Sequence, residues 1–220
     1  RRGTYNPGIG SELKPSAFGG GAAFDDGKVY MTDGVGNVVA LNAASGSVLW
    51  KVKPSGPLRG SPTIAFGSIF VMTQDNQIFA LNSADGSVQW QESGSSTQAG
   101  VFGVAAPAAG QGTVIAGYSS GELIAHRYEN GRTLWADALA LTSISTQVGS
   151  LTDIDADPII DNGRVYALGQ GGRSEQPADR CDGNYEGFHE LFSCQCFGID
   201  PVSGHREAKE IFPNACQGAF

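Results

Sequence analysis

The sequence predicts an all-β protein, a β-propeller built from four-stranded blades. Three observations carry this prediction: a repeat of about 40 residues, short apolar runs with strand-like alternation, and glycines between those runs. The chain has 32 glycines in 220 residues, roughly twice the usual share of about 7%. No stretch has the sustained 3.6-residue period of a helix. Short antiparallel strands repeated at this length are typical of propeller blades.

A tryptophan motif marks three successive repeats. Each motif reads Gly-x-x-x-Trp, and the tryptophans stand 40 and 45 residues apart. We expect the indole rings to be largely buried at equivalent places, filling the wedge between neighbouring sheets. We expect the glycines to take a positive φ in a hairpin turn. Ala-Leu-Asn precedes the motif twice, and Ala125-His126-Arg127 is its degenerate third copy. The structural residues of the blades are Gly46, Trp50, Gly86, Trp90, Gly131 and Trp135.

A second mark runs in phase with the first. Three prolines each stand five residues before a glycine that opens a short apolar strand: Pro62, Pro107 and Pro158. Strands are therefore predicted at 69–71, 114–116 and 165–167, with an earlier one at 29–31. Two independent marks in phase indicate a true repeat rather than a chance similarity.

Composition and charge exclude several classes of protein. The formal charge is −8, without a cluster of lysine or arginine, so we expect no nucleic acid partner. No apolar run approaches the length needed for a membrane-spanning helix. Arg1-Arg2-Gly3 has no apolar signal region behind it, so we expect the start to be internal to a longer protein or already processed.

The blade motif resembles the PQQ-like repeat, and within that superfamily the chain is similar to the BamB family of outer-membrane assembly lipoproteins. The resemblance covers about residues 19–173. It implies an eight-bladed propeller, of which this chain would be a fragment with about four blades. Unpaired edges of a half propeller invite another chain, so either a partner supplies the rest or the fragment is only marginally stable. The similar stretches are 19–24 with 38–41, 61–63 with 73–81, and 150–158.

The resemblance implies a non-catalytic scaffold of the outer-membrane β-barrel assembly machinery. Its partners would be the periplasmic domains of the barrel-inserting subunit, BamA, together with unfolded outer-membrane proteins. The expected location is the periplasmic face of the bacterial outer membrane. We expect membrane attachment only through an N-terminal lipid anchor that this chain does not include.

Two segments are candidate docking loops by the same resemblance. Asp153 and Asp155 match the family signature in the surface implicated in docking BamA, and carboxylates accept charge-assisted hydrogen bonds from basic partners. The alternative is that these aspartates bond turn amides before the strand that follows Pro158. Residues 100–107 correspond to the second loop, where Phe102 replaces the family's arginine. Val101 and Phe102 could form an apolar anchor there.

The sequence predicts no cofactor, metal or catalytic centre. Asp153, Asp155 and Asp157 have the spacing of a calcium loop, but Pro158 and Arg164 stand where an EF-hand needs glycine and glutamate. The alternative function is a fragment of a PQQ-dependent quinoprotein dehydrogenase. That enzyme class needs an adjacent Cys-Cys pair and a further tryptophan, and the chain has neither.

The last segment departs from the blade pattern, so we divide the chain into blades at 1–173 and an atypical tail at 174–220. A trace of the blade persists at 197–200, with Ala208 at the tryptophan position. The tail is thus a degenerate blade, an appended segment or unrelated sequence. Two alternatives stay open for its cysteines: disulfides, or a zinc site that lacks the usual Cys-x-x-Cys spacing. All four cysteines of the chain lie here: Cys181, Cys194, Cys196 and Cys216.

Overall fold

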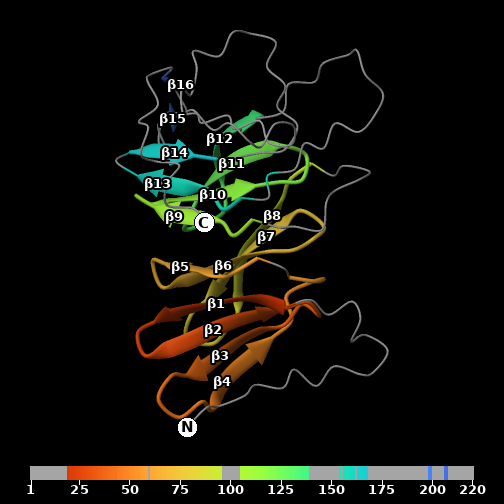
Figure 1. The fold of residues 1–220 in the computed structure, drawn as a ribbon, viewed down its shortest axis with the longest axis vertical. Helices are drawn as coiled ribbons and strands as arrows, with labels where there is room; N and C mark the ends of the chain where they lie inside the picture. Colours follow the sequence, from red (N-terminus) through yellow and green to blue (C-terminus); the bar gives the residue numbers. More distant parts are fainter. Residues whose placement is uncertain are drawn as a thin grey trace, which may run out of the picture.

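The computed structural model confirms the all-β propeller-type fold: its strands form four antiparallel sheets of four strands each. Figure 1 shows the sheets following one another along the long axis of the molecule. Within the part of the chain that the structure describes there is no helix, and none that could cross a membrane. The described residues are 19–58, 60–95, 105–138, 154, 156–161, 163–167, 198–199 and 206–207.

Each sheet is one blade, and its strands pair in chain order. The first blade contains β1 (Gly19–Asp25), β2 (Lys28–Asp33), β3 (Val38–Asn42) and β4 (Val48–Val52). The second contains β5 (Thr63–Ala65), β6 (Ser68–Met72), β7 (Gln77–Asn82) and β8 (Val88–Ser93). The third contains β9 (Ala108–Gly110), β10 (Thr113–Gly117), β11 (Glu122–Arg127) and β12 (Thr133–Ala138). The fourth contains β13 (Ile159–Asp161), β14 (Arg164–Tyr166), β15 (Gly198–Ile199) and β16 (Arg206–Glu207).

The strands predicted from the proline and glycine marks fall on the second strand of each blade, namely β2, β6, β10 and β14. The fourth blade takes its last two strands from the tail. Val165 of β14 pairs with Ile199, and Ile199 pairs with Arg206. The four cysteines lie outside the described residues. The division at residue 173 stays a prediction.

The blades have two distinct ends. At one end, which we call the turn end, the β1–β2 and β3–β4 turns meet, and Ala43 N donates to Gly27 O at 2.9 Å. At the other end, which we call the connector end, the β2–β3 turn and its equivalents lie beside the segments that join successive blades. Gln74 N donates to Pro57 O at 3.0 Å there.

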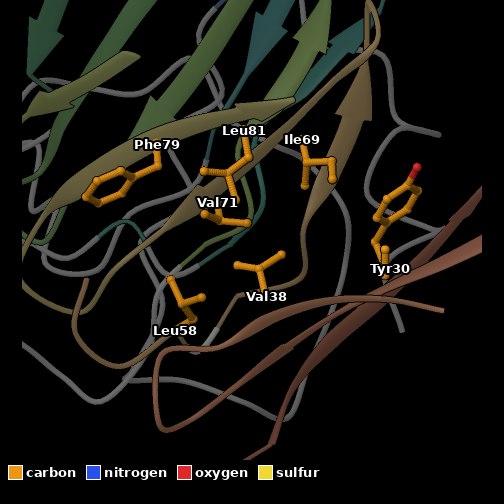
Figure 2. Close-up of a cluster of buried hydrophobic side chains, with 8 residues drawn as sticks. Tyr30, Val38, Leu58, Ile69, Val71, Phe79 and Leu81 are labelled. Carbon is orange, nitrogen blue, oxygen red and sulfur yellow. The ribbon is translucent and has the colours of Figure 1, made fainter. Parts of the chain in front are cut away.

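Apolar side chains fill the space between the blades. Side chains of a strand alternate between its two faces, so β6 directs Ile69 and Val71 toward the first blade and Phe70 and Met72 toward the third. One strand therefore serves two junctions. Figure 2 shows the cluster between the first two blades, formed by Tyr30, Val38, Leu58, Ile69, Val71, Phe79 and Leu81.

The three tryptophans occupy equivalent positions on the fourth strands. Each pairs with an alanine of the third strand beside a β-bulge. Trp50 Nε1 donates to Ser83 O of the second blade at 3.3 Å, and Trp90 Nε1 donates to Tyr128 O of the third at 2.7 Å. Trp90 is buried, and Trp50 and Trp135 are partly buried.

The motif glycines have the positive φ that the hairpin needs, at 74°, 76° and 71° for Gly46, Gly86 and Gly131. The structure adds a second requirement. A Cβ atom built on Gly86 would lie 2.8 Å from the ring of Trp50, and one on Gly131 would lie 2.6 Å from the ring of Trp90. Each glycine thus makes room for the indole of the preceding blade.

Candidate functional site at the connector end

The four predicted docking residues, Val101, Phe102, Asp153 and Asp155, lie outside the described residues. They belong to two connectors, β8 to β9 and β12 to β13. The structure describes residues 105–107 of the first connector and 154 and 156–158 of the second. The site is therefore built from these flanking residues and from the turns beside them.

A hydrogen bond joins the two connectors. Ala106 N donates to Asp157 Oδ1 at 2.7 Å, although the two residues are 51 apart in the sequence. Ala105, Ala106 and Pro107 are buried, while Asp157 is exposed. The third aspartate of the Asp-x-Asp-x-Asp run therefore bonds a backbone amide, but one of the neighbouring connector rather than of its own turn.

Ile154, between the two candidate aspartates, is anchored in the protein. Its side chain is 2% exposed and packs in the junction between the third and fourth blades. Its amide donates to Tyr118 O at 3.3 Å. A Cβ on Gly117 would lie 2.5 Å from Ile154 Cγ2, so a glycine at the end of β10 is what admits this side chain.

Asn76 links the second and third blades at the same end. Its backbone has φ of 59°, at the position held by glycine in the first and third blades, Gly36 and Gly121. Asn76 Oδ1 accepts from Ser119 N at 3.2 Å, and Nδ2 donates to Ser95 O at 3.0 Å and to Ser119 Oγ at 2.7 Å. The buried amide thus replaces a glycine with a cross-blade tie.

Glu122 adds a fixed carboxylate beside Asn76. Burial acts to raise its pKa, but hydrogen bonds from Ser95 N, Ser95 Oγ and Ser120 Oγ outweigh burial and hold the pKa below its ordinary value. Asp33 is positioned by hydrogen bonds in the first blade, where its Oδ1 accepts from Val35 N and Asn37 N at 3.0 and 2.9 Å. The connector end therefore presents carboxylates whose positions are set by hydrogen bonds.

The described residues contain no group of three or more His, Cys, Asp or Glu side chains arranged to hold a metal ion. Two of the three aspartates at 153–157 and all four cysteines lie outside this part of the chain. The described turns and connectors supply backbone amides, hydroxyls and carboxylates. Such an arrangement suits polar recognition of another protein's surface.

The family model described as "Outer membrane protein assembly factor BamB" matches residues 5–183. The chain belongs to the BamB family. Its members from Escherichia coli K12 and Salmonella typhimurium are 33% and 34% identical over 159 and 153 residues. These matches cover 72% and 70% of this chain but 41% and 39% of the relatives. The chain thus spans about two fifths of the length of those BamB proteins.

Solved structures share the fold. The crystal structure of BamB from Moraxella catarrhalis superposes with a TM-score of 0.68 at 24% identity, covering 85% of this chain and 51% of that one. A europium-containing methanol dehydrogenase superposes with a TM-score of 0.63 at 17% identity, covering 86% and 41%. At such identities the likeness establishes the fold alone. Sequence membership, not structural likeness, distinguishes the BamB family from the dehydrogenases here.

Proposed function

We propose that this chain is a non-catalytic β-propeller scaffold of the outer-membrane β-barrel assembly machinery. It docks the periplasmic domains of the barrel-inserting subunit at the periplasmic face of the outer membrane and thereby aids the assembly of outer-membrane proteins. Membership of the BamB family carries the proposal. The bond between Ala106 and Asp157 supports a single docking surface, because it ties together the two connectors that hold all four candidate residues.

The chemistry of the connector end supports a partner with basic groups. Ile154 is buried, and we propose that the loop carrying Asp153 and Asp155 on either side of it faces solvent. Their carboxylates would accept charge-assisted hydrogen bonds from lysine or arginine of the partner. Val101 and Phe102 would add an apolar anchor beside them.

The double variant Asp153→Ala/Asp155→Ala tests the docking role. Exposed charge pairs are worth roughly 0.2–1 kcal/mol each, so binding to the purified periplasmic domains of the barrel-inserting subunit should weaken by about two- to thirtyfold. The weakening should shrink at high salt, because exposed charges are then screened. Titration calorimetry gives the affinity, and thermal unfolding should give an almost unchanged midpoint.

The matched control is Asp25→Ala/Glu129→Ala. It removes the same two negative charges from exposed positions at the turn end and should leave the affinity unchanged. Equal loss of affinity in both double variants would mean that only net charge matters. Unfolding of the Asp153/Asp155 variant, with normal binding by the molecules that remain folded, would make those aspartates structural turn residues. Either result overturns the proposed docking surface.

The alternative is a fragment of a quinoprotein dehydrogenase, an enzyme class that shares the fold. The chain has no adjacent Cys-Cys pair to face a quinone. We expect the protein mixed with PQQ and calcium to show no saturable binding by fluorescence and no dye-linked oxidation of alcohols. Turnover that disappears on chelation of calcium would favour the dehydrogenase over the scaffold.

A further inference from the structure

Tyr118, which directly follows β10, contacts both of the connectors that hold the candidate docking residues. Its carbonyl accepts the amide hydrogen of Ile154, in the connector from β12 to β13, at 3.3 Å. Its ring lies against Gly94, the first residue of the connector from β8 to β9, because a Cβ atom built on Gly94 would lie 2.4 Å from Tyr118 Cδ1. The two connectors leave different blades, so Tyr118 is a neighbour that they share.

The Tyr118 side chain reaches from the connector end into the junction between the second and third blades. It is 1% exposed, and its hydroxyl lies 3.2 Å from His126 Nε2. The other ring nitrogen of His126 lies 2.9 Å from Gly131 O, which can only accept, so Nε2 is the acceptor for the tyrosine hydroxyl. Burial is the main cause that raises the pKa of Tyr118, which keeps the hydroxyl protonated, as this bond requires.

Protonation of His126 removes this hydrogen bond. A histidinium carries hydrogen on both ring nitrogens, so Nε2 no longer accepts. The hydroxyl hydrogen of Tyr118 then loses its acceptor in a buried position, which is costly. Uptake of a proton by His126 therefore favours arrangements in which the Tyr118 ring has moved away from it.

The charged groups around the pair decide when this happens. Glu92 of β8 acts on both rings, and Glu122 of β11 acts on the Tyr118 hydroxyl. The neighbours of His126 on the adjoining strands, Val114 of β10 and Thr133 of β12, are uncharged. Burial lowers the pKa of His126 in spite of Glu92 and of the bond to Gly131 O. The folded ring therefore becomes protonated only below the ordinary histidine pKa of about 6.5.

The junction between the first and second blades has no such pair. Thr73 occupies the position of Tyr118, since Thr73 N donates to Gln77 O as Tyr118 N donates to Glu122 O. The Thr73 hydroxyl bonds only within its own turn in the described contacts, donating to Gln77 O at 3.4 Å and accepting from Gln77 N at 3.2 Å. The link to a histidine is therefore a feature of the third blade, beside the connectors, and not of the blade pattern.

We propose that Tyr118 is a positioning residue for both connectors, and that the bond between its hydroxyl and His126 makes their attachment to the fold depend on the protonation of that histidine. Acid would weaken the contacts of Gly94 and Ile154 with Tyr118. It would thereby also lower the affinity for the docking partner. This last consequence rests on the proposed function, whereas the positioning role does not.

Amide hydrogen exchange of the free protein, measured by NMR, tests the link. The protection factors of the Gly94 and Ile154 amides, which correct for the intrinsic effect of pH, are compared at pH 7.5 and pH 5.0. Linkage to a group with an ordinary pKa of about 6.5 allows a fall of at most about thirtyfold, and we expect roughly three- to thirtyfold. The Gln74 amide, which bonds Pro57 O at the connector end of the first junction, is the reference and should keep its protection.

Tyr118→Phe and Tyr30→Phe form a matched pair of variants. Each removes one hydroxyl from a tyrosine that is 1% exposed, but the Tyr30 hydroxyl donates to Ser83 O at the turn end. Tyr118→Phe keeps the ring against Gly94, so the connector amides should stay protected at pH 7.5 and should no longer respond to pH. Tyr30→Phe should behave as the wild type does.

The double variant His126→Leu/Tyr118→Phe serves if Tyr118→Phe does not fold, because it leaves neither ring nitrogen nor hydroxyl unpaired. It should give the same flat pH profile at the connector amides. A profile in the double variant that falls as steeply as that of the wild type would contradict the link through His126.

Titration calorimetry with the periplasmic domains of the barrel-inserting subunit separates this proposal from the proposed function. Between pH 7.5 and pH 5.0 the affinity of Tyr30→Phe should fall more than that of Tyr118→Phe. If amide protection responds to pH and affinity does not, the positioning role stands and the docking surface is wrong. Three results would overturn the role of Tyr118: constant protection of Gly94 and Ile154 in the wild type, an equal fall at Gln74, or a pH response in Tyr118→Phe equal to that of the wild type.

Discussion

The junction between the first and second blades and the junction between the second and third use the same backbone with different chemistry. In the first junction, Leu81 fills the space beside Trp50 and the core is apolar. In the second, His126 stands at the position of Leu81 and packs beside Trp90, with ring centroids 6.0 Å apart. The comparison shows that the junction accepts a buried polar side chain when the fold supplies hydrogen-bond partners for it.

Those partners account for both ring nitrogens of His126. Nδ1 lies 2.9 Å from Gly131 O, which can only accept, so Nδ1 carries the hydrogen. Nε2 then accepts from the Tyr118 hydroxyl at 3.2 Å. Burial lowers the pKa of His126, although the bond to Gly131 O and the charge of Glu92 act in the opposite direction. The neutral ring is the form that the second junction stabilises.

Replacing Trp90 or Trp50 with alanine should destabilise the two junctions to different extents. These are the largest losses in the free energy of unfolding that we predict. Trp90 is buried and has the shorter indole bond, 2.7 Å, so Trp90→Ala should lower the free energy of unfolding by about 3–5 kcal/mol. Trp50 is half-buried and its bond is 3.3 Å, so Trp50→Ala should cost less. Urea unfolding measures both. A larger loss from Trp50→Ala would contradict this ranking.

Replacing a glycine that lies against an indole ring should give the next largest loss of stability. Gly131→Ala combines strain at a positive φ with a Cβ 2.6 Å from Trp90, so we expect a loss of about 2–4 kcal/mol. Gly67→Ala has the same backbone strain, with φ of 72°, but no atom within 4 Å of its Cβ. It should cost about 1–2 kcal/mol. Equal losses in the two variants would mean that the glycines serve only the turn.

The sequence could predict the blades, but not that these glycines also make room for the indole rings of neighbouring blades. The spacing of Gly46, Gly86 and Gly131 showed a repeated turn, and the turn explained them sufficiently. Their second role joins residues of different blades, such as Trp50 and Gly86, which become neighbours only when the sheets pack. His126 stood out only as a break in the Ala-Leu-Asn pattern, because its partners lie on another strand and another blade.

The candidate site was less predictable still. Asp153 and Asp155 came from a resemblance to a family, and no local pattern separates docking aspartates from turn aspartates. The cross-connector bond between Ala106 and Asp157 and the replacement of a glycine by Asn76 both depend on which connectors and turns meet. A single sequence does not show which connectors and turns become neighbours in the fold.

The pH dependence of stability should sharpen the comparison of the junctions. Because the folded protein depresses the pKa of His126, the unfolded state binds the proton more tightly. Stability should be complete above the ordinary histidine pKa of about 6.5 and fall as the pH drops below it, by at most about 1.4 kcal/mol per pH unit for this one group.

The variant His126→Leu/Tyr118→Phe isolates this group. It restores the leucine found at the equivalent positions of the first two blades and leaves no unpaired hydroxyl. Urea unfolding at pH 7.5 and at pH 5.0 should show a smaller difference in the variant than in the wild type. An unchanged difference would mean that the proton binds elsewhere.

Asn76→Gly should give the smallest effect. The substitution supplies the residue found at Gly36 and Gly121, so the positive φ is kept while the bonds to Ser95 and Ser119 are lost. Each net hydrogen bond is worth about 1 kcal/mol, but glycine also relieves the strain of a positive φ, worth about 1–2 kcal/mol. We therefore expect a net loss of about 1–2 kcal/mol in the free energy of unfolding. A stabilised variant would show that the cross-blade tie contributes nothing.

The most direct test of the account is to map where the partner binds. Hydrogen exchange of the chain, alone and with saturating periplasmic domains of the barrel-inserting subunit, reports on both ends of the blades in one experiment. The account predicts slower exchange in peptides covering 94–107 and 139–158, with no change in those covering 83–87 and 128–132. Protection of the turn end, or no protection at either end under saturation, would contradict a docking surface at the connector end.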